Sequence, residues 1–158
     1  MRVDRPQSGT RHIGPRMHRK PGGTCDSLFH RASRVCPGLG PEQRCDTTTR
    51  RSVRQALSHL DTDCVEDAEL LVTELVSNAY DHGQPPISLR LCHLPNSLLH
   101  IDVEDGDRTH LPRLRVSGVA GERGRGLVLV DQLSRGWGFN VTTTSKVVWA
   151  EMNCRASR

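Results

Sequence analysis

The stretch from Asp63 to Gly83 constrains the fold more than any other part of the chain, because it has the periodicity of a helix with two unlike faces. At about 100° per residue its apolar residues fall on one arc, and its polar residues form a stripe on the opposite side. Asp63 followed by Glu66 predicts the N-terminal cap, and Gly83 predicts the end of the helix. The apolar arc comprises Val65, Ala68, Leu71, Val72, Leu75, Val76 and Ala79, and the polar stripe comprises Asp67, Glu74, Asn78 and Asp81.

Two residues of the polar stripe, Glu74 and Asn78, are four positions apart and therefore share one face of the helix. A carboxylate can act as a general base toward water or a hydroxyl group. A carboxamide oxygen beside it can bind a magnesium ion. The alternative is a solvated helix face, which any amphipathic helix presents. The stripe indicates chemistry only if phosphate-binding elements follow it in the chain.

The remaining patterned segments predict two more helices and two hairpins. Apolar residues at helical spacing indicate the helices, and alternating apolar residues indicate the strands. The predicted helices cover residues 47–60 and 127–133, and the predicted strands cover residues 87–92, 99–104, 137–143 and 146–152. Since the apolar faces of the strands and helices can cover one another, the sequence predicts a two-layer α/β sandwich.

Asp105 and Gly106 come directly after the strand predicted at 99–104. A carboxylate at the end of a strand can accept a hydrogen bond from an exocyclic amine, and glycine lets the backbone pass close to a flat ring. The alternative is an ordinary Asp-Gly turn. Residues 108–120 have little pattern, and a loop of this length is either functional or disordered.

A glycine-rich segment from Gly121 to Gly126 precedes the helix predicted from Leu127. Glycines at this place allow backbone N–H groups and the positive end of the helix to face phosphate oxygens. Arg123 and Arg125 add positive charge within the segment. Alone, such a segment is a weak motif.

The charge of the chain is unevenly spread. The net charge is +4 overall, but residues 1–51 carry +7 and the remainder carries −3. We therefore predict a basic, disordered leader over residues 1–45, a folded domain over 46–153 and a tail over 154–158. A strand within residues 28–35 is left open. Nucleic-acid binding by the folded domain is not expected, because its own charge is mildly acidic.

The six cysteines show no zinc-binding spacing, and the chain shows no apolar signal sequence or membrane-spanning run. These features predict a cytoplasmic protein without membrane contact, in which the thiols are reduced. Cys64 and Cys92 are expected to act as small apolar residues of the core.

Together, the motifs resemble the GHKL ATPases of the gyrase, chaperone and histidine-kinase type. The greatest similarity is to a short single-domain bacterial branch typified by anti-sigma-factor serine/threonine kinases, and it covers residues 47–152. The resemblance implies the Bergerat fold, a mixed and mostly antiparallel sheet covered by three helices. The motifs that carry it are Glu74-Leu-Val-Ser-Asn78-Ala-Tyr-Asp-His82-Gly83, then Asp105-Gly106, then Gly124-Arg125-Gly126-Leu127.

The resemblance also implies ATP and Mg²⁺ as the bound groups and assigns roles to single residues. Asn78 is expected to bind the metal ion and through it the phosphates of ATP, and Glu74 to act as the catalytic general base. Asp105 is expected to bind the adenine amine, with Gly106 giving room for the ring. Residues 108–123 would form a mobile lid. The phosphate-binding turn would comprise Arg123, Gly124, Arg125, Gly126 and Leu127.

The function that the resemblance implies is a serine/threonine protein kinase that binds a sigma factor and phosphorylates an anti-sigma-factor antagonist. A homodimer is compatible with it. One alternative is a non-catalytic module whose binding of a partner protein is gated by nucleotide. Another is the ATPase part of a split histidine kinase, which is disfavoured because no helical hairpin with a phosphoacceptor histidine precedes the domain. Nucleic-acid binding through the basic leader is the weakest alternative.

Overall fold

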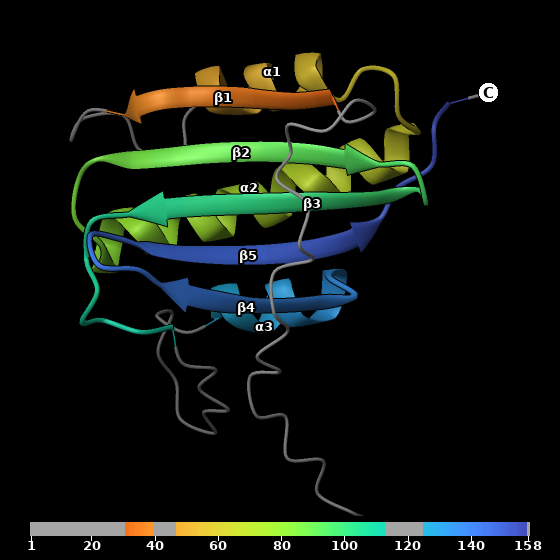
Figure 1. Cartoon of the computed structure of the whole chain (residues 1–158). Coiled ribbons are helices and arrows are strands. Elements are labelled where there is room, and N and C mark those ends of the chain that lie inside the picture. Colours follow the sequence, from red (N-terminus) through yellow and green to blue (C-terminus); the bar gives the residue numbers. More distant parts are fainter. Residues whose placement is uncertain (1–30, 40–46, 113–124, 158) are drawn as a thin grey trace, which may run out of the picture.

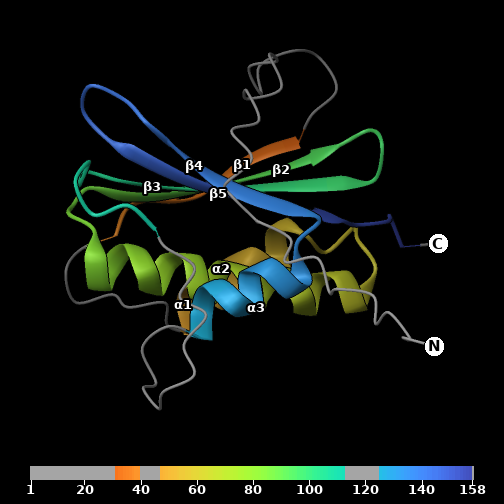
Figure 2. The same cartoon turned by 90° about the horizontal axis from the view of Figure 1, so that it is seen from below.

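The computed structural model describes residues 31–39, 47–112 and 125–157, with side chains described from Thr49 to Pro112 and from Gly126 to Ser157. Five strands form one sheet in the order β1-β2-β3-β5-β4, and the helices cover one face of it (Figures 1 and 2). The elements in chain order are β1 Arg31–Leu39, α1 Thr47–Ala56, α2 Thr62–His82, β2 Ile87–Leu94, β3 Leu98–Asp105, α3 Arg125–Leu133, β4 Gly136–Val141 and β5 Lys146–Asn153.

The predicted two-layer α/β sandwich is confirmed, but all strand pairs described are antiparallel rather than mixed. The reason lies in the connection through α3. That connection leads from β3 to β4 at the edge of the sheet, and the β4–β5 hairpin then returns the chain to the position beside β3. The strand that neighbours β3 therefore runs opposite to it.

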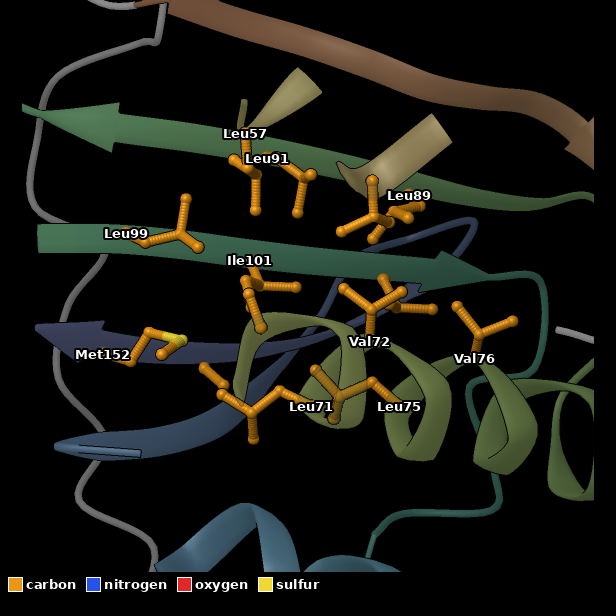
Figure 3. Packing of buried hydrophobic residues seen from close by; sticks show 14 of the residues in the cluster. Leu57, Leu71, Val72, Leu75, Val76, Leu89, Leu91, Leu99, Ile101 and Met152 are labelled. Carbon is orange, nitrogen blue, oxygen red and sulfur yellow. The ribbon is translucent and has the colours of Figure 1, made fainter. Parts of the chain in front are cut away.

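Helix α2 lies under the middle of the sheet and supplies most of the contact between the two layers. Its buried side includes every residue of the predicted apolar arc. Figure 3 shows Leu71, Val72 and Leu75 directed toward side chains such as Ile101 of β3. Each fully buried aliphatic side chain of this kind stabilises the fold by about 1.5–3 kcal/mol. The apolar arc therefore fixes which face of α2 remains available for the polar stripe.

The N-terminal end of α2 differs from the sequence prediction, and the C-terminal end agrees with it. The capping residue is Asp61, and its side chain makes no capping hydrogen bond, so the cap predicted at Asp63 is wrong. Asp63 lies in the first helical turn, where its negative charge is favourable near the helix N-terminus. At the other end, Gly83 donates its backbone N–H to the Ala79 carbonyl at 2.8 Å, which confirms the predicted end.

The sheet begins earlier than the predicted domain boundary. Strand β1 lies within the residues assigned to the leader and pairs with β2 along the edge of the sheet. Its register with β2 shifts between Arg34 and Cys36 and again between Cys36 and Leu39. Because such irregularities interrupt the two-residue alternation, the strand leaves no clear pattern in the sequence. Residues 1–30 and 40–46 of the predicted leader lie outside the described residues.

The segment predicted as a C-terminal tail is bound to the connection between α1 and α2. Asp61 donates its backbone N–H to the Arg155 carbonyl at 3.0 Å, and Ser157 donates its own to the His59 carbonyl at 3.1 Å. Leu60 and Ala156 form a β-bridge between these contacts. These backbone hydrogen bonds make residues 154–157 part of the fold.

Cys64, in the first turn of α2, and Cys154, just beyond β5, form a disulfide with their Cα atoms 5.5 Å apart. The prediction of reduced thiols is therefore wrong for this pair, and Cys64 is more than an apolar filler. Cys92 is buried and forms no disulfide, as predicted. None of the helices described is both long and apolar enough to span a membrane.

Candidate functional site

The polar stripe of α2 meets the beginning of α3 at Gly126. A β-carbon at Gly126 would collide with Glu74 Oε2 and would lie 3.6 Å from Asn78 Nδ2. A residue with any side chain could not occupy this position without displacing the glutamate. The glycine thus allows the start of α3 to approach a carboxylate and a carboxamide that are one helical turn apart.

Asn78 has an amide nitrogen that is buried and has no hydrogen-bond partner. Most buried polar atoms are hydrogen-bonded, and an unpaired one costs about 1–3 kcal/mol. Rotation of the carboxamide exchanges its nitrogen and oxygen, so the same position can present an acceptor. This unpaired group fits the binding of a polar ligand, and the oxygen suits a hard cation such as Mg²⁺.

Asp105 ends β3 and is almost fully buried, with 1% of its surface exposed. A β-carbon at Gly83 would lie 2.6 Å from Asp105 Cγ, so the glycine after α2 is required by this close approach. Its φ of −106° does not itself demand glycine. Gly106 is equally crowded, because a β-carbon there would lie 2.8 Å from the Pro85 carbonyl oxygen. The end of α2 and the end of β3 are therefore held in direct contact.

The two oxygens of the Asp105 carboxylate differ in their partners. Oδ1 accepts a hydrogen bond from the backbone N–H of Asp107 at 2.8 Å. Oδ2 lies 3.3 Å from the ammonium nitrogen of Lys146, but it makes no hydrogen bond. The contact with Lys146 is an ion pair without the alignment of a hydrogen bond. Oδ2 consequently keeps its capacity to accept a hydrogen bond, which suits the predicted contact with an amine.

Asp107 follows Gly106 and organises the turn after β3. Its Oδ1 accepts hydrogen bonds from the hydroxyl and the backbone N–H of Thr109, and His110 donates to it as well. These donors stabilise the ionised carboxylate and hold its pKa well below the usual value. The turn is therefore fixed by the Asp107 side chain.

The ends of these elements meet at one side of the molecule, where β3 ends, β5 begins and α2 ends (Figures 1 and 2). Asp105 and Lys146 are direct partners in the antiparallel register of β3 and β5. Glu74 and Asn78 of α2 meet α3 at Gly126, whereas Gly83, just after α2, meets Asp105 at the end of β3. The structure thus places the predicted site residues in two groups of contacts, one of Glu74 and Asn78 with Gly126, and one of Asp105 and Gly106 with the segment that follows α2.

The rest of the predicted phosphate-binding turn is only partly described. Arg123 and Gly124 lie outside the described residues, and of Arg125 only the backbone is described, at the start of α3. Leu127 is half-buried on α3. Of the predicted lid, only residues 108–112 are described.

Two residues near Asp105 were not predicted as part of the site. Lys146 is buried against Asp105, and Gly83 was expected only to end the helix. Both contacts join positions far apart in the sequence, so only the strand register and the helix-to-sheet packing reveal them. In the part of the chain that the structure describes, no cluster of three or more His, Cys, Asp or Glu residues could hold a metal ion.

An open antiparallel sheet with helices on one face is the architecture of a GHKL-type ATPase domain. Residues 42–151 match the model of the histidine kinase-like ATPase domain family, and the chain belongs to that family. A search among curated proteins found no match.

Among solved structures, the chain is similar to the histidine kinase domain of a blue-light-activated histidine kinase, EL346, from Erythrobacter litoralis. The sequence identity is 21% and the TM-score is 0.44. The alignment covers 58% of this chain, and the chain spans 45% of the length of that structure.

Proposed function

We propose that this protein is an ATP-dependent serine/threonine protein kinase that binds a sigma factor and phosphorylates an anti-sigma-factor antagonist. The observation that carries the proposal is the placement of Glu74 and Asn78 one turn apart on α2, both against Gly126 of α3. Membership of the histidine kinase-like ATPase family supports the use of ATP. The resemblance to the anti-sigma-factor branch supports the partners and a homodimer.

In the proposed reaction, Asp105 accepts a hydrogen bond from the adenine amine, and the first backbone N–H groups of α3 bind phosphate oxygens. Asn78 would hold Mg²⁺ through its carboxamide oxygen, and when bound the ion would supply neutralisation of phosphate charge. Glu74 takes the proton of a serine hydroxyl of the antagonist as that oxygen bonds to the γ-phosphorus. The bond between the γ-phosphorus and the bridging oxygen breaks, and ADP leaves.

The test is transfer of phosphate from γ-labelled ATP to the purified anti-sigma-factor-antagonist proteins of the same organism. Because Glu74 is the proposed base, Glu74→Gln is expected to lower the transfer rate by about 10²–10⁴-fold. Asp67→Asn is the matched control, since Asp67 lies on the same stripe of α2, two helical turns before Glu74. The control is expected to transfer phosphate at the rate of the native chain.

Two other outcomes would contradict the kinase. If the native chain binds ATP but transfers no phosphate to a serine or threonine of any antagonist, the non-catalytic nucleotide-gated module is the better reading. If the label is found on a histidine of a partner protein, the chain is the ATPase part of a split histidine kinase.

A further inference from the structure

Lys146 is the first residue of β5, and it is buried with 3% of its surface exposed. Lysine is almost never fully buried unless its charge is paired. Here the charge faces Asp105, the direct partner of Lys146 in the register of β3 and β5. The two residues therefore form a buried ion pair at the end of the sheet where α2 also ends.

The hydrogen bonds of this pair are incomplete. Lys146 Nζ donates to the His110 carbonyl oxygen at 2.6 Å, whereas its 3.3 Å contact with Asp105 Oδ2 is not a hydrogen bond. An ammonium group has three N–H donors, so Lys146 can donate further. Asp105 Oδ2 can still accept. A free acceptor and a free donor thus lie side by side.

We propose that Lys146 is a specificity-determining residue that donates a hydrogen bond to the N1 atom of adenine, beside the exocyclic amine bound by Asp105. This inference rests on the proposed function, which places the base at Asp105. The edge of adenine presents an N–H donor next to a ring-nitrogen acceptor. The N–H donor complements the carboxylate acceptor of Asp105, and the ring nitrogen complements the ammonium donor of Lys146.

The same pair rejects guanine held in the same orientation. Guanine presents a carbonyl oxygen where adenine presents its amine, and a ring N–H where adenine presents an acceptor. The carbonyl oxygen would then face the Asp105 carboxylate, and the ring N–H would face the Lys146 ammonium. The first contact would face an acceptor with an acceptor, and the second a donor with a donor. Both would leave buried polar groups unsatisfied, which is the most effective way to discriminate between ligands.

The proposal is tested by comparing the binding of ATP with that of 1-deaza-ATP, in which a C–H group replaces N1. The native chain is expected to bind ATP about tenfold more tightly, since a hydrogen bond to a charged group is lost in the analogue. In Lys146→Met the two nucleotides are expected to bind equally. ATP and 1-deaza-ATP both carry the exocyclic amine. Any effect of the substitution on Asp105 therefore changes both affinities and cancels in their ratio.

Ser145→Ala is the control, because Ser145 is the adjacent residue and its hydroxyl donates to Glu104 instead. It is expected to keep the native ratio. If the native chain and Lys146→Met show the same ratio, the role of Lys146 is overturned while ATP binding stands. If the native chain binds neither nucleotide, the proposed function itself fails. Equal binding of both nucleotides by the native chain also overturns the role, even if Lys146→Met does not fold.

Discussion

At the scale of single residues, Gly126 gives the sharpest test of the site. Gly126→Ala places a methyl group against Glu74 Oε2, so the flexible glutamate must move. We expect phosphate transfer to fall by about a hundredfold, because small misplacements of reacting groups have effects of that size. The free energy of unfolding should change by less than about 1 kcal/mol, since alanine favours a helix over glycine.

Gly136→Ala is the matched control for this substitution. Gly136 begins β4, and nothing lies within 4 Å of the position that its β-carbon would take. Phosphate transfer should therefore stay at the native rate. Urea unfolding of both variants separates an effect on the site from an effect on stability. Native transfer by Gly126→Ala would show that the Glu74 carboxylate is not required at its present position.

Asn78 carries the second prediction at this scale. Asn78→Ala should remove most of the Mg²⁺-dependent part of ATP affinity, because Asn78 supplies the carboxamide beside Gly126. The measurement is titration with fluorescent ATP, with and without Mg²⁺. Asp105→Ala should lower the ATP affinity with and without Mg²⁺, since Asp105 is proposed to bind the adenine ring and not the metal. Equal metal dependence in native chain and Asn78→Ala would contradict the role of Asn78.

The site residues show how far the sequence could be read at this scale. Glu74 and Asn78 were predictable because a helix places residues four apart on one face. Asp105 was predictable from its position at the end of a strand. Lys146 was not, because its meeting with Asp105 depends on the register of two strands separated by more than forty residues. Local patterns do not encode such a register.

At the scale of elements, the same distinction holds. The bounds of α2 and of the β2–β3 hairpin were predicted within a few residues, because burial of one face imposes a period on the sequence. Strand β1 was missed as a defined element, since its bulged register breaks that period. The β-bridge between Leu60 and Ala156 was missed for a different reason, as a single bridge has no period at all.

The pairing of β3 with β5 carries a prediction about pH. His100 of β3 bonds through Nε2 to Asp102 at 2.9 Å and through Nδ1 to Glu151 of β5 at 3.0 Å. Burial lowers the pKa of His100, but the hydrogen bonds and charges of the two carboxylates outweigh it, and the net pKa is raised. The protonated ring therefore stabilises the folded chain.

A raised pKa in the folded state means that this stabilisation is complete below about pH 6.5, the unfolded value. It is lost as the pH rises through the folded pKa. We expect the native chain to exceed His100→Gln in unfolding free energy by more at pH 6 than at about pH 9. Urea unfolding at both values measures the difference. A constant difference would show that His100 contributes only packing, for example against Trp149, with which its ring stacks.

At the scale of the whole molecule, residues at the C-terminal end of the chain contact the segment that leads into α2. The backbone of Asp61 and His59 bonds to residues 155–157, and His93 of β2 bonds through Nε2 to the Cys154 carbonyl at 3.1 Å. The Cys64–Cys154 disulfide joins the same two regions covalently. Since α2 carries Glu74 and Asn78, these contacts fix the helix of the site against the last strand of the sheet.

The disulfide closes a loop of 90 residues, which restricts the unfolded chain far more than the folded one. Cys64→Ser combined with Cys154→Ser should therefore lower the free energy of unfolding by about 2–4 kcal/mol. Dithiothreitol should lower the stability of the native chain by a similar amount and leave that of the double variant unchanged. ATP affinity should change little, because the backbone contacts of residues 155–157 remain. If the reductant destabilises both proteins equally, the Cys64–Cys154 disulfide does not stabilise the fold.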